Sequence, residues 1–154
     1  MKKQVLVLVM FFMVSSSSIF AQGYLKVNPI SLAVGIVNLG YEQVTTPKQS
    51  VQLKAYSHFS TGLYGGRLMY KFFLSNKPSP AGLYVAPIAA YVGSEGDGIF
   101  RVGGLIGYQA IFSNDKLSFE GAIGPAVVPD SETGVLPIFS LNLGIRIGGG
   151  HRSK

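Results

Sequence analysis

The chain has 154 residues, of which 20 are glycine and none is cysteine, and its formal net charge is +6. Its length suits one domain and excludes most multidomain enzymes. The lack of cysteine excludes a disulfide scaffold, a thiolate metal site and a cysteine nucleophile. Only 13% of the residues are charged, against roughly a quarter in an average globular domain, and 47% are apolar. This composition argues against a disordered chain and against an ordinary cytosolic enzyme.

The first 21 residues have the three-part layout of a secretory signal peptide. Lys2 and Lys3 form a cationic head, VLVLVMFFMV follows as an apolar run, and a stretch of small residues ends at Ala21. The apolar run is about half the roughly twenty residues that a membrane-spanning helix needs. We therefore predict that residues 1–21 are cleaved and that residues 22–154 form the mature domain. Exported proteins rarely meet nucleic acid, so no nucleic-acid partner is expected.

The next segment is predicted to form a β-hairpin. The first strand is expected over Leu25–Ala33, with Pro29 tolerated as an edge or bulge residue, and Val34 and Gly35 form a tight connection. In residues 36–44, apolar side chains alternate with polar or small ones. This period of two predicts a strand with one apolar face.

Six further strands are expected along the rest of the chain. The clearest pattern is Phe139–Ile147, in which every second residue is apolar. The six strands are expected over residues 50–56, 64–73, 81–92, 99–112, 117–127 and 135–147. Turn-forming sequences such as TTPKQ, SNKPSP and PDSETG separate these segments. Short strands that recur at this spacing predict an antiparallel meander of eight strands.

The composition of the polar faces decides which side of the barrel is apolar. A soluble barrel would carry many charges on its outer face. Here the polar faces of the strands hold small residues and few charges. Such faces suit the filled lumen of an eight-stranded barrel. Six aromatic residues close to three polar turns predict an interfacial girdle: Tyr41, Phe72, Phe73, Tyr84, Phe112 and Phe119. The predicted fold class is an all-β, antiparallel up-and-down transmembrane β-barrel with eight strands.

At residues 24–148 the chain resembles the small eight-stranded outer-membrane barrels of Gram-negative bacteria, the OmpA/OmpX-like group. More narrowly, it resembles an uncharacterised family of such barrels through KVNPIS, NLGYEQ and LNLGIRIG. The resemblance implies the outer membrane as location, membrane lipid and the barrel-insertion machinery as partners, and no catalytic residues. The chain departs from the group at its end, where GGGHRSK follows Ile147 in place of an aromatic residue.

Charged residues on the polar faces are expected to pair inside the lumen, because charges in a low dielectric need partners. A turn centred near Lys48 would place Glu42 opposite Lys54. The later hairpins would place Gln109 opposite Glu120, with Arg146 near by. We predict two polar clusters that act as a structural plug, with these members: Glu42, Lys54 and Arg67 in one, and Gln109, Glu120 and Arg146 in the other.

An enzymatic alternative rests on His58 and Ser60, which loosely resemble the histidine and serine of outer-membrane lipid A deacylases. Thr61 stands where those enzymes have asparagine, and no orienting glutamate follows. Glu95 and Asp97 offer too few oxygens for calcium, so no metal or other cofactor is expected. We expect a non-enzymatic barrel with an envelope-structural or surface-interaction role. The alternatives are a lipid A-modifying enzyme and a soluble periplasmic lipocalin-like carrier.

Overall fold

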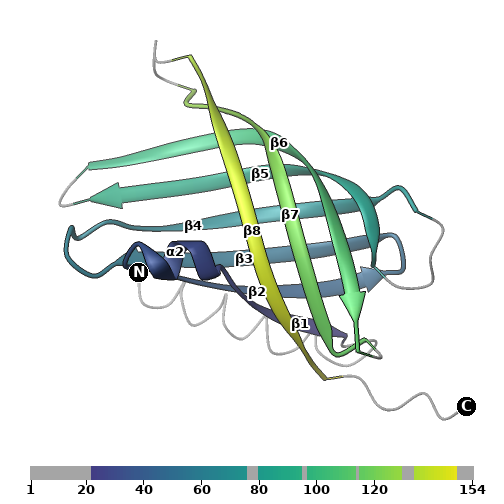
Figure 1. Cartoon of the computed structure of the whole chain (residues 1–154). Helices are drawn as coiled ribbons and strands as arrows, with labels where there is room; N and C mark the ends of the chain where they lie inside the picture. Colours follow the sequence, from purple (N-terminus) through teal and green to yellow (C-terminus); the bar gives the residue numbers. More distant parts are fainter. Residues whose placement is uncertain (1–21, 76–79, 95–96, 114, 130–133, 149–154) are drawn as a thin grey trace, which may run out of the picture.

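The computed structural model describes residues 22–75, 80–94, 97–113, 115–129 and 134–148. The predicted signal peptide lies outside these ranges. The strands are β1 (Gly23–Val27), β2 (Ile36–Thr46), β3 (Gln49–His58), β4 (Tyr64–Phe73), β5 (Gly82–Ser94), β6 (Asp97–Phe112), β7 (Leu117–Val127) and β8 (Val135–Ile147), and one short helix is α2 (Pro29–Ala33). The strands form a closed antiparallel barrel in chain order (Figure 1). The predicted all-β up-and-down barrel with eight strands is confirmed.

The barrel has two ends, to which we give fixed names. The terminal end holds Gly23, the first residue of β1, and Ile147, the last residue of β8, which lie opposite each other. The far end holds α2 and the connection between β3 and β4, which lie together in Figure 1. The β2–β3 turn belongs to the terminal end.

The strands are tilted because their register is staggered. A row of paired residues starts at Ile145 on β8, passes through Leu25 on β1 and continues around the barrel. It returns to β8 at Val135, ten residues from its start. For eight strands about 4.8 Å apart, this stagger corresponds to a tilt of about 40°, within the usual range for barrels.

The same row defines the outer face of the barrel. All of its members are apolar: Ile145, Leu25, Tyr41, Leu53, Leu68, Ala89, Val102, Val127 and Val135. Most of its large side chains are exposed, as for Leu53 at 44% and Leu68 at 50%. On each strand, the residues directly before and after a member of this row point inward, as the period of two requires. We call this row the outer apolar row.

The prediction of one strand over Leu25–Ala33 is wrong. β1 ends at Val27, and α2 begins at Pro29. Proline suits the first helical position because its missing N–H would have no partner there. The side chain of Asn28 caps the helix by accepting hydrogen bonds from the backbone N–H groups of Ile30 and Ser31, at 3.0 and 3.1 Å. No helix in the described ranges is long and apolar enough to cross a membrane.

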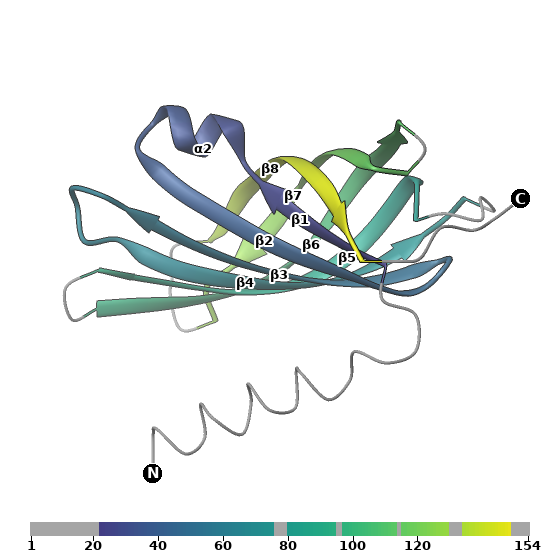
Figure 2. The ribbon, with the colours of Figure 1, turned by 90° about the horizontal axis from the view of Figure 1, so that it is seen from below.

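Beyond Val27 the wall of the barrel is completed by α2. β1 pairs with only five residues of β8, from Leu143 to Ile147, although β8 begins at Val135. α2 contacts both β2 and β8 and lies over the space between them in Figure 2. Gly35, whose φ of +79° is unfavourable for other residues, then turns the chain into β2.

The aromatic girdle is only partly present. Tyr41, Phe72 and Phe119 are exposed on the outer face, as are Phe112 and other apolar residues near the terminal end. Phe73 and Tyr84, however, are 4% and 0% exposed and pack inside the barrel with ring centroids 5.5 Å apart. Because Phe72 and Phe73 are consecutive in a strand, only one of them can face outward.

The interior has an apolar part beside its polar part. Met69 and Phe73 from β4, Tyr84 and Ile88 from β5, and Leu105 from β6 form a buried cluster. This cluster lines β4 to β6, and the polar side chains of β1, β2 and β7 face it across the lumen. Apolar and polar side chains thus share the interior of the barrel.

Candidate functional site

Four charged residues meet inside the barrel from four different strands. They are Lys26 on β1, Glu42 on β2, Lys71 on β4 and Glu120 on β7, and each is at most 1% exposed. We call them the central quartet. The Nζ atom of Lys26 contacts the Oε2 atoms of both glutamates. The Nζ atom of Lys71 contacts the same two oxygens, at 2.9 Å in Glu42 and 2.8 Å in Glu120.

Neutral groups occupy the remaining hydrogen-bonding positions of the quartet. Gln109 accepts hydrogen bonds from the two lysines through Oε1, at 2.8 and 3.0 Å, and donates through Nε2 to the carbonyl of Pro80 at 2.9 Å. The second oxygen of Glu42 accepts from Ser50 at 2.5 Å, and that of Glu120 accepts from the Tyr84 hydroxyl at 2.7 Å. Both carboxylates are therefore bonded at both oxygens.

Glycines beside Lys26 make room for its side chain. Lys26 lies opposite Gly40 on β2 and Gly144 on β8. A Cβ atom on Gly144 would lie 3.0 Å from Cγ of Lys26 and 2.3 Å from Oγ of Ser118. Because neither neighbour has a side chain, the aliphatic part of Lys26 can lie along the wall while its ammonium group reaches the glutamates.

The charge balance of the quartet makes it a structural element. Two cations and two anions compensate one another, and removing one member of such a buried group typically destabilises a protein by about 3–5 kcal/mol. A network in which every polar atom is bonded favours one arrangement of its strands over others. The quartet thus joins β1, β2, β4 and β7 across the lumen.

The predicted pairing of Glu42 with Lys54 is wrong. Glu42 lies opposite Gln52, and Lys54 lies opposite Gly40. The prediction assumed a turn centred on Lys48. The turn is centred between Pro47 and Lys48, which moves the partner of Glu42 by one residue, and a register shift between Val44 and Thr46 moves it by one more. Such an irregularity inserts one extra residue on one strand and leaves no clear mark in the alternation.

The predicted cluster of Gln109, Glu120 and Arg146 is only partly formed. Gln109 and Glu120 lie opposite each other on β6 and β7. Arg146 does not join them, because the partner of Glu120 on β8 is Asn142. The guanidinium of Arg146 lies instead at the terminal end, 3.9 Å from the carboxylate of Asp115.

The two lysines of the quartet were not among the predicted network residues. Lys71 alternates with apolar residues on a predicted polar face, which was the available signal for an inward position. Lys26 likewise lies between the apolar Leu25 and Val27, in the part of the predicted first strand that the structure retains. Its contact with Glu120 joins residues 94 positions apart, so the pairing depends on the stagger of the whole barrel.

Lys54 and Arg67 lie on the far-end side of the quartet. The Nζ atom of Lys54 donates to Oγ of Ser140 at 2.9 Å and to Oδ1 of Asn142 at 2.7 Å, both on β8. Arg67 is directly opposite Lys54. Lys54 and Arg67 are thus neighbours as predicted, but within the described residues neither forms an ion pair with Glu42.

His58 and Ser60 are in contact in the connection at the far end. Nδ1 of His58 lies 3.3 Å from Oγ of Ser60, and it also accepts a hydrogen bond from the backbone N–H of Ser60 at 3.2 Å. Both contacts are exposed. No carboxylate in the described part of the chain bonds to His58, so the described residues supply a serine and a histidine without an orienting acid.

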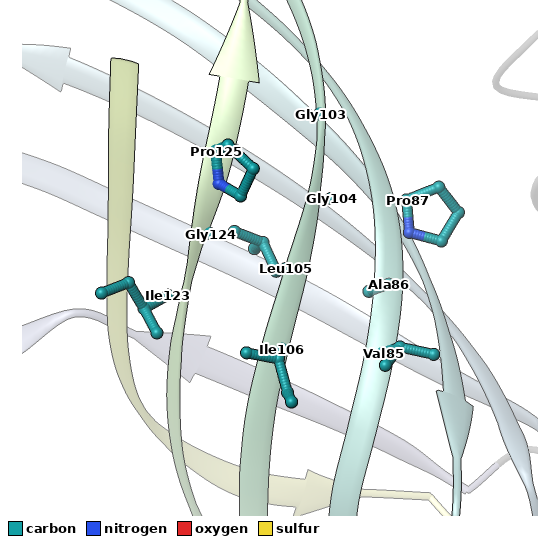
Figure 3. A pocket seen from close by; sticks show the side chains of 10 residues that line it. All are labelled: Val85, Ala86, Pro87, Gly103, Gly104, Leu105, Ile106, Ile123, Gly124 and Pro125. Carbon is teal, nitrogen blue, oxygen red and sulfur yellow. The ribbon is translucent and has the colours of Figure 1, made fainter. Parts of the chain in front are cut away.

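A groove of about 450 Å³ lies on the outer face over β5, β6 and β7 (Figure 3). Exposed Val85, Ile106 and Ile123 border it, and its other lining residues are Ala86, Pro87, Gly103, Gly104, Leu105, Gly124 and Pro125. Strands β6 and β7 approach closely there, because a Cβ on Gly124 would lie 1.9 Å from the carbonyl oxygen of Gly104. The groove is lined without charged or titratable side chains.

Neither a metal site in the described residues nor a matching protein family indicates a function for this chain. In the described ranges, no group of three histidine, cysteine or acidic residues could hold a metal ion. In comparisons with protein-family models, curated proteins and solved structures, none matches this chain. The features that bear on its function are therefore the polarity of the barrel and the contents of its lumen.

Proposed function

We propose that this protein is a non-enzymatic outer-membrane β-barrel with a side-chain-filled polar lumen and an envelope-structural or surface-interaction role. The observation that carries the proposal is the inverted polarity of the barrel. Leu53 and Leu68 on the outer apolar row are about half exposed, whereas Glu42 and Glu120 inside are 0% exposed. Soluble proteins rarely bury charged side chains completely, and they do so only when the charges are paired.

The outer apolar row is too extensive for a water-exposed surface. Monomeric soluble proteins rarely expose contiguous apolar patches larger than a few hundred Å², and this row crosses every strand of the barrel. In the hydrocarbon core of a bilayer the same side chains have no unfavourable contact with water. A closed barrel also satisfies the backbone hydrogen bonds that a bilayer cannot.

The filled lumen favours a structural role over a transport role. The central quartet joins strands on opposite sides of the barrel, and its side chains are excluded from solvent. An eight-stranded barrel has an interior just wide enough for side chains. We therefore expect no steady ion conductance when the protein is inserted in a planar bilayer.

The soluble-carrier alternative fits the interior less well. A lipocalin-like carrier would need an apolar cavity for its ligand and a charged exterior. Here the lysines and glutamates of the quartet occupy the interior, and leucine, isoleucine and phenylalanine residues cover the exterior. This distribution supports the membrane proposal.

The proposed orientation follows from the predicted signal peptide. Export across the inner membrane would leave the terminal end in the periplasm and the far end, with α2 and the β3–β4 connection, outside the cell. The partners would be outer-membrane lipid and, during assembly, the barrel-insertion machinery. Surface contacts would then involve the far end.

The membrane proposal is tested by fractionation and by heat modifiability. Carbonate-washed outer membranes should retain the protein, and boiled and unboiled samples should migrate differently on a denaturing gel, because a closed barrel resists detergent until it is heated. Release of the protein by osmotic shock, without detergent, would contradict the proposal. A known periplasmic protein released in the same sample is the control.

A lipid-hydrolase activity is the second candidate, favoured by the 3.3 Å contact between Ser60 and His58. In this mechanism the histidine would take the proton of the serine hydroxyl. Replacing Ser60 with alanine should abolish any change in lipid A acylation that depends on the protein. Identical acylation in cells with the wild-type protein, the Ser60→Ala variant and no protein would exclude this candidate.

A further inference from the structure

Three cationic side chains lie on one row of paired residues inside the far half of the barrel. Lys54 is opposite Arg67, Arg67 is opposite Ala90, and Ala90 is opposite Arg101. Cross-strand partners point to the same face of a sheet, and Ala90 is 5% exposed inside the barrel. Lys54, Arg67 and Arg101 therefore all face the lumen, and we call them the cation row.

The cation row has no counter-charge in the described part of the chain. The two interior glutamates belong to the central quartet, in which two lysines already balance them. The ammonium group of Lys54 donates only to neutral oxygens of Ser140 and Asn142. Arg67 and Arg101 form no ion pair within the described ranges. Because like charges opposite each other destabilise a sheet, an anion between them would be favourable.

Several hydrogen-bonding groups beside the cation row are also unused. Nη1 of Arg67 and Nε of Arg101 are buried and have no hydrogen-bond partner. Gln52, the next inward residue to Lys54 on β3, is 0% exposed, and neither atom of its amide has a partner. Its Nε2 lies 3.6 Å from the position that a Cβ on Gly40 would occupy, so this glycine leaves space at the amide.

Part of the cation row is accessible to solvent. Arg67 and Arg101 are partly exposed, whereas the residues of the central quartet are not. The cation row therefore lies between the far end and the solvent-excluded quartet. A small solute that enters at the far end would meet the side chains of the cation row before it meets any carboxylate of the quartet.

We propose that the cation row and Gln52 form a binding site for a phosphate group, supplied either as inorganic phosphate or by a lipid headgroup. Two guanidinium groups separated by the small Ala90 can each present paired N–H donors to tetrahedral oxygens. Lys54 adds a compact charge, and the Gln52 amide adds a neutral donor. The site requires the barrel interior alone, so it does not depend on the location of the protein in the outer membrane.

The test uses the full mature chain refolded in a phosphate-free nonionic detergent. Binding of inorganic phosphate and of dihexanoyl phosphatidic acid is measured by titration calorimetry, at constant ionic strength with chloride as the replaced anion. The variants are Arg67→Gln and Arg101→Gln. Lys116→Gln, which removes an exposed cation near the terminal end, is the matched control for net charge.

The expected result is saturable binding that weakens about tenfold or more in each arginine variant and stays unchanged in Lys116→Gln. Binding of both probes would assign the site to free phosphate, and binding of phosphatidic acid alone would assign it to a lipid headgroup. Equal binding by all variants, or no binding of either probe, would overturn the proposal. It would also be overturned if chloride stabilised the wild type as much as phosphate does.

A stability measurement gives a second and independent readout. Without phosphate, Arg67→Gln should unfold at a higher temperature than the wild type, because it removes a positive charge directly opposite Lys54. Phosphate should raise the unfolding temperature of the wild type and leave that of the variant almost unchanged. If the variant is less stable than the wild type without phosphate, the argument from uncompensated charge is wrong.

Discussion

The Nζ atom of Lys71 on β4 lies 2.8 Å from the Oε2 atom of Glu120 on β7, on the opposite side of the barrel. This contact joins residues 49 positions apart in the chain. It also places a lysine against the apolar cluster, with its Nζ atom 5.0 Å from the centre of the Tyr84 ring. The ion pair and the aromatic ring together occupy the middle of the lumen.

Replacing Lys71 with methionine should destabilise the barrel by about 3–5 kcal/mol, because two buried glutamates would then share Lys26 alone. Urea unfolding of the protein refolded in detergent micelles measures this change. The double variant Lys71→Met/Glu42→Gln keeps the Lys26–Glu120 pair and should recover part of the loss. Equal stability of the Lys71→Met variant and the wild type would show that the quartet makes no net contribution.

Replacing Gly107 with alanine should destabilise the barrel by about 1–3 kcal/mol through overpacking. A Cβ atom there would lie 2.5 Å from Cζ of Tyr84 and 2.8 Å from Cβ of Ala122. Tyr84 would have to move away from Glu120, whose carboxylate it now contacts. Gly121→Ala is the matched control on β7, because its Cβ would meet nothing within 4 Å. The same urea measurement should leave this control near the wild type.

Replacing Asn28 with alanine should weaken the start of α2 by about 1 kcal/mol, because the side-chain acceptor at the N-cap is lost. Hydrogen exchange of the Ile30 and Ser31 amides, which donate to Asn28, should become faster. Asn28→Ser, which retains an acceptor, should stay close to the wild type. Unchanged exchange in the alanine variant would mean that contacts with β2 and β8 alone hold the helix.

Replacing Leu53 with arginine should destabilise the membrane-inserted barrel by about 2–4 kcal/mol if Leu53 lies at mid-bilayer depth. Refolding into vesicles with increasing urea measures the change. Phe59→Arg is the control, because Phe59 is 78% exposed in the connection at the far end, outside the row that we place in lipid. Equal effects of the two substitutions would contradict the assignment of the outer apolar row to hydrocarbon.

Most of the strands could be predicted because alternation with a period of two is a local property of the sequence. Residues 64–73, 117–127 and 135–147 match β4, β7 and β8. The first hairpin failed because the Asn28-Pro29 pair was interpreted as an interruption within a strand. It is instead the start of a helix, where an asparagine cap and a proline at the first position are favourable.

The contacts inside the lumen could be predicted only in part. Gln109 and Glu120 are partners in one hairpin, so counting from the turn places them together. The partner of Glu42 was misplaced by two residues, one because the turn is not centred on Lys48 and one because the register shift after Val44 is not visible in the alternation. The contact of Lys26 with Glu120 depends on the stagger between the first and the last strand, which no local pattern contains.

The five residues of β1 have a consequence for how the barrel is assembled. β1 joins β8 through pairs such as Gly23 with Ile147, which lie at opposite ends of the described chain. Closing so long a loop is entropically unfavourable and is compensated by only a short ladder. We therefore expect β2 to β8 to form first, as a curved sheet with two unpaired edges. Docking of β1 would be the last step, and it would bring Lys26 to the two glutamates.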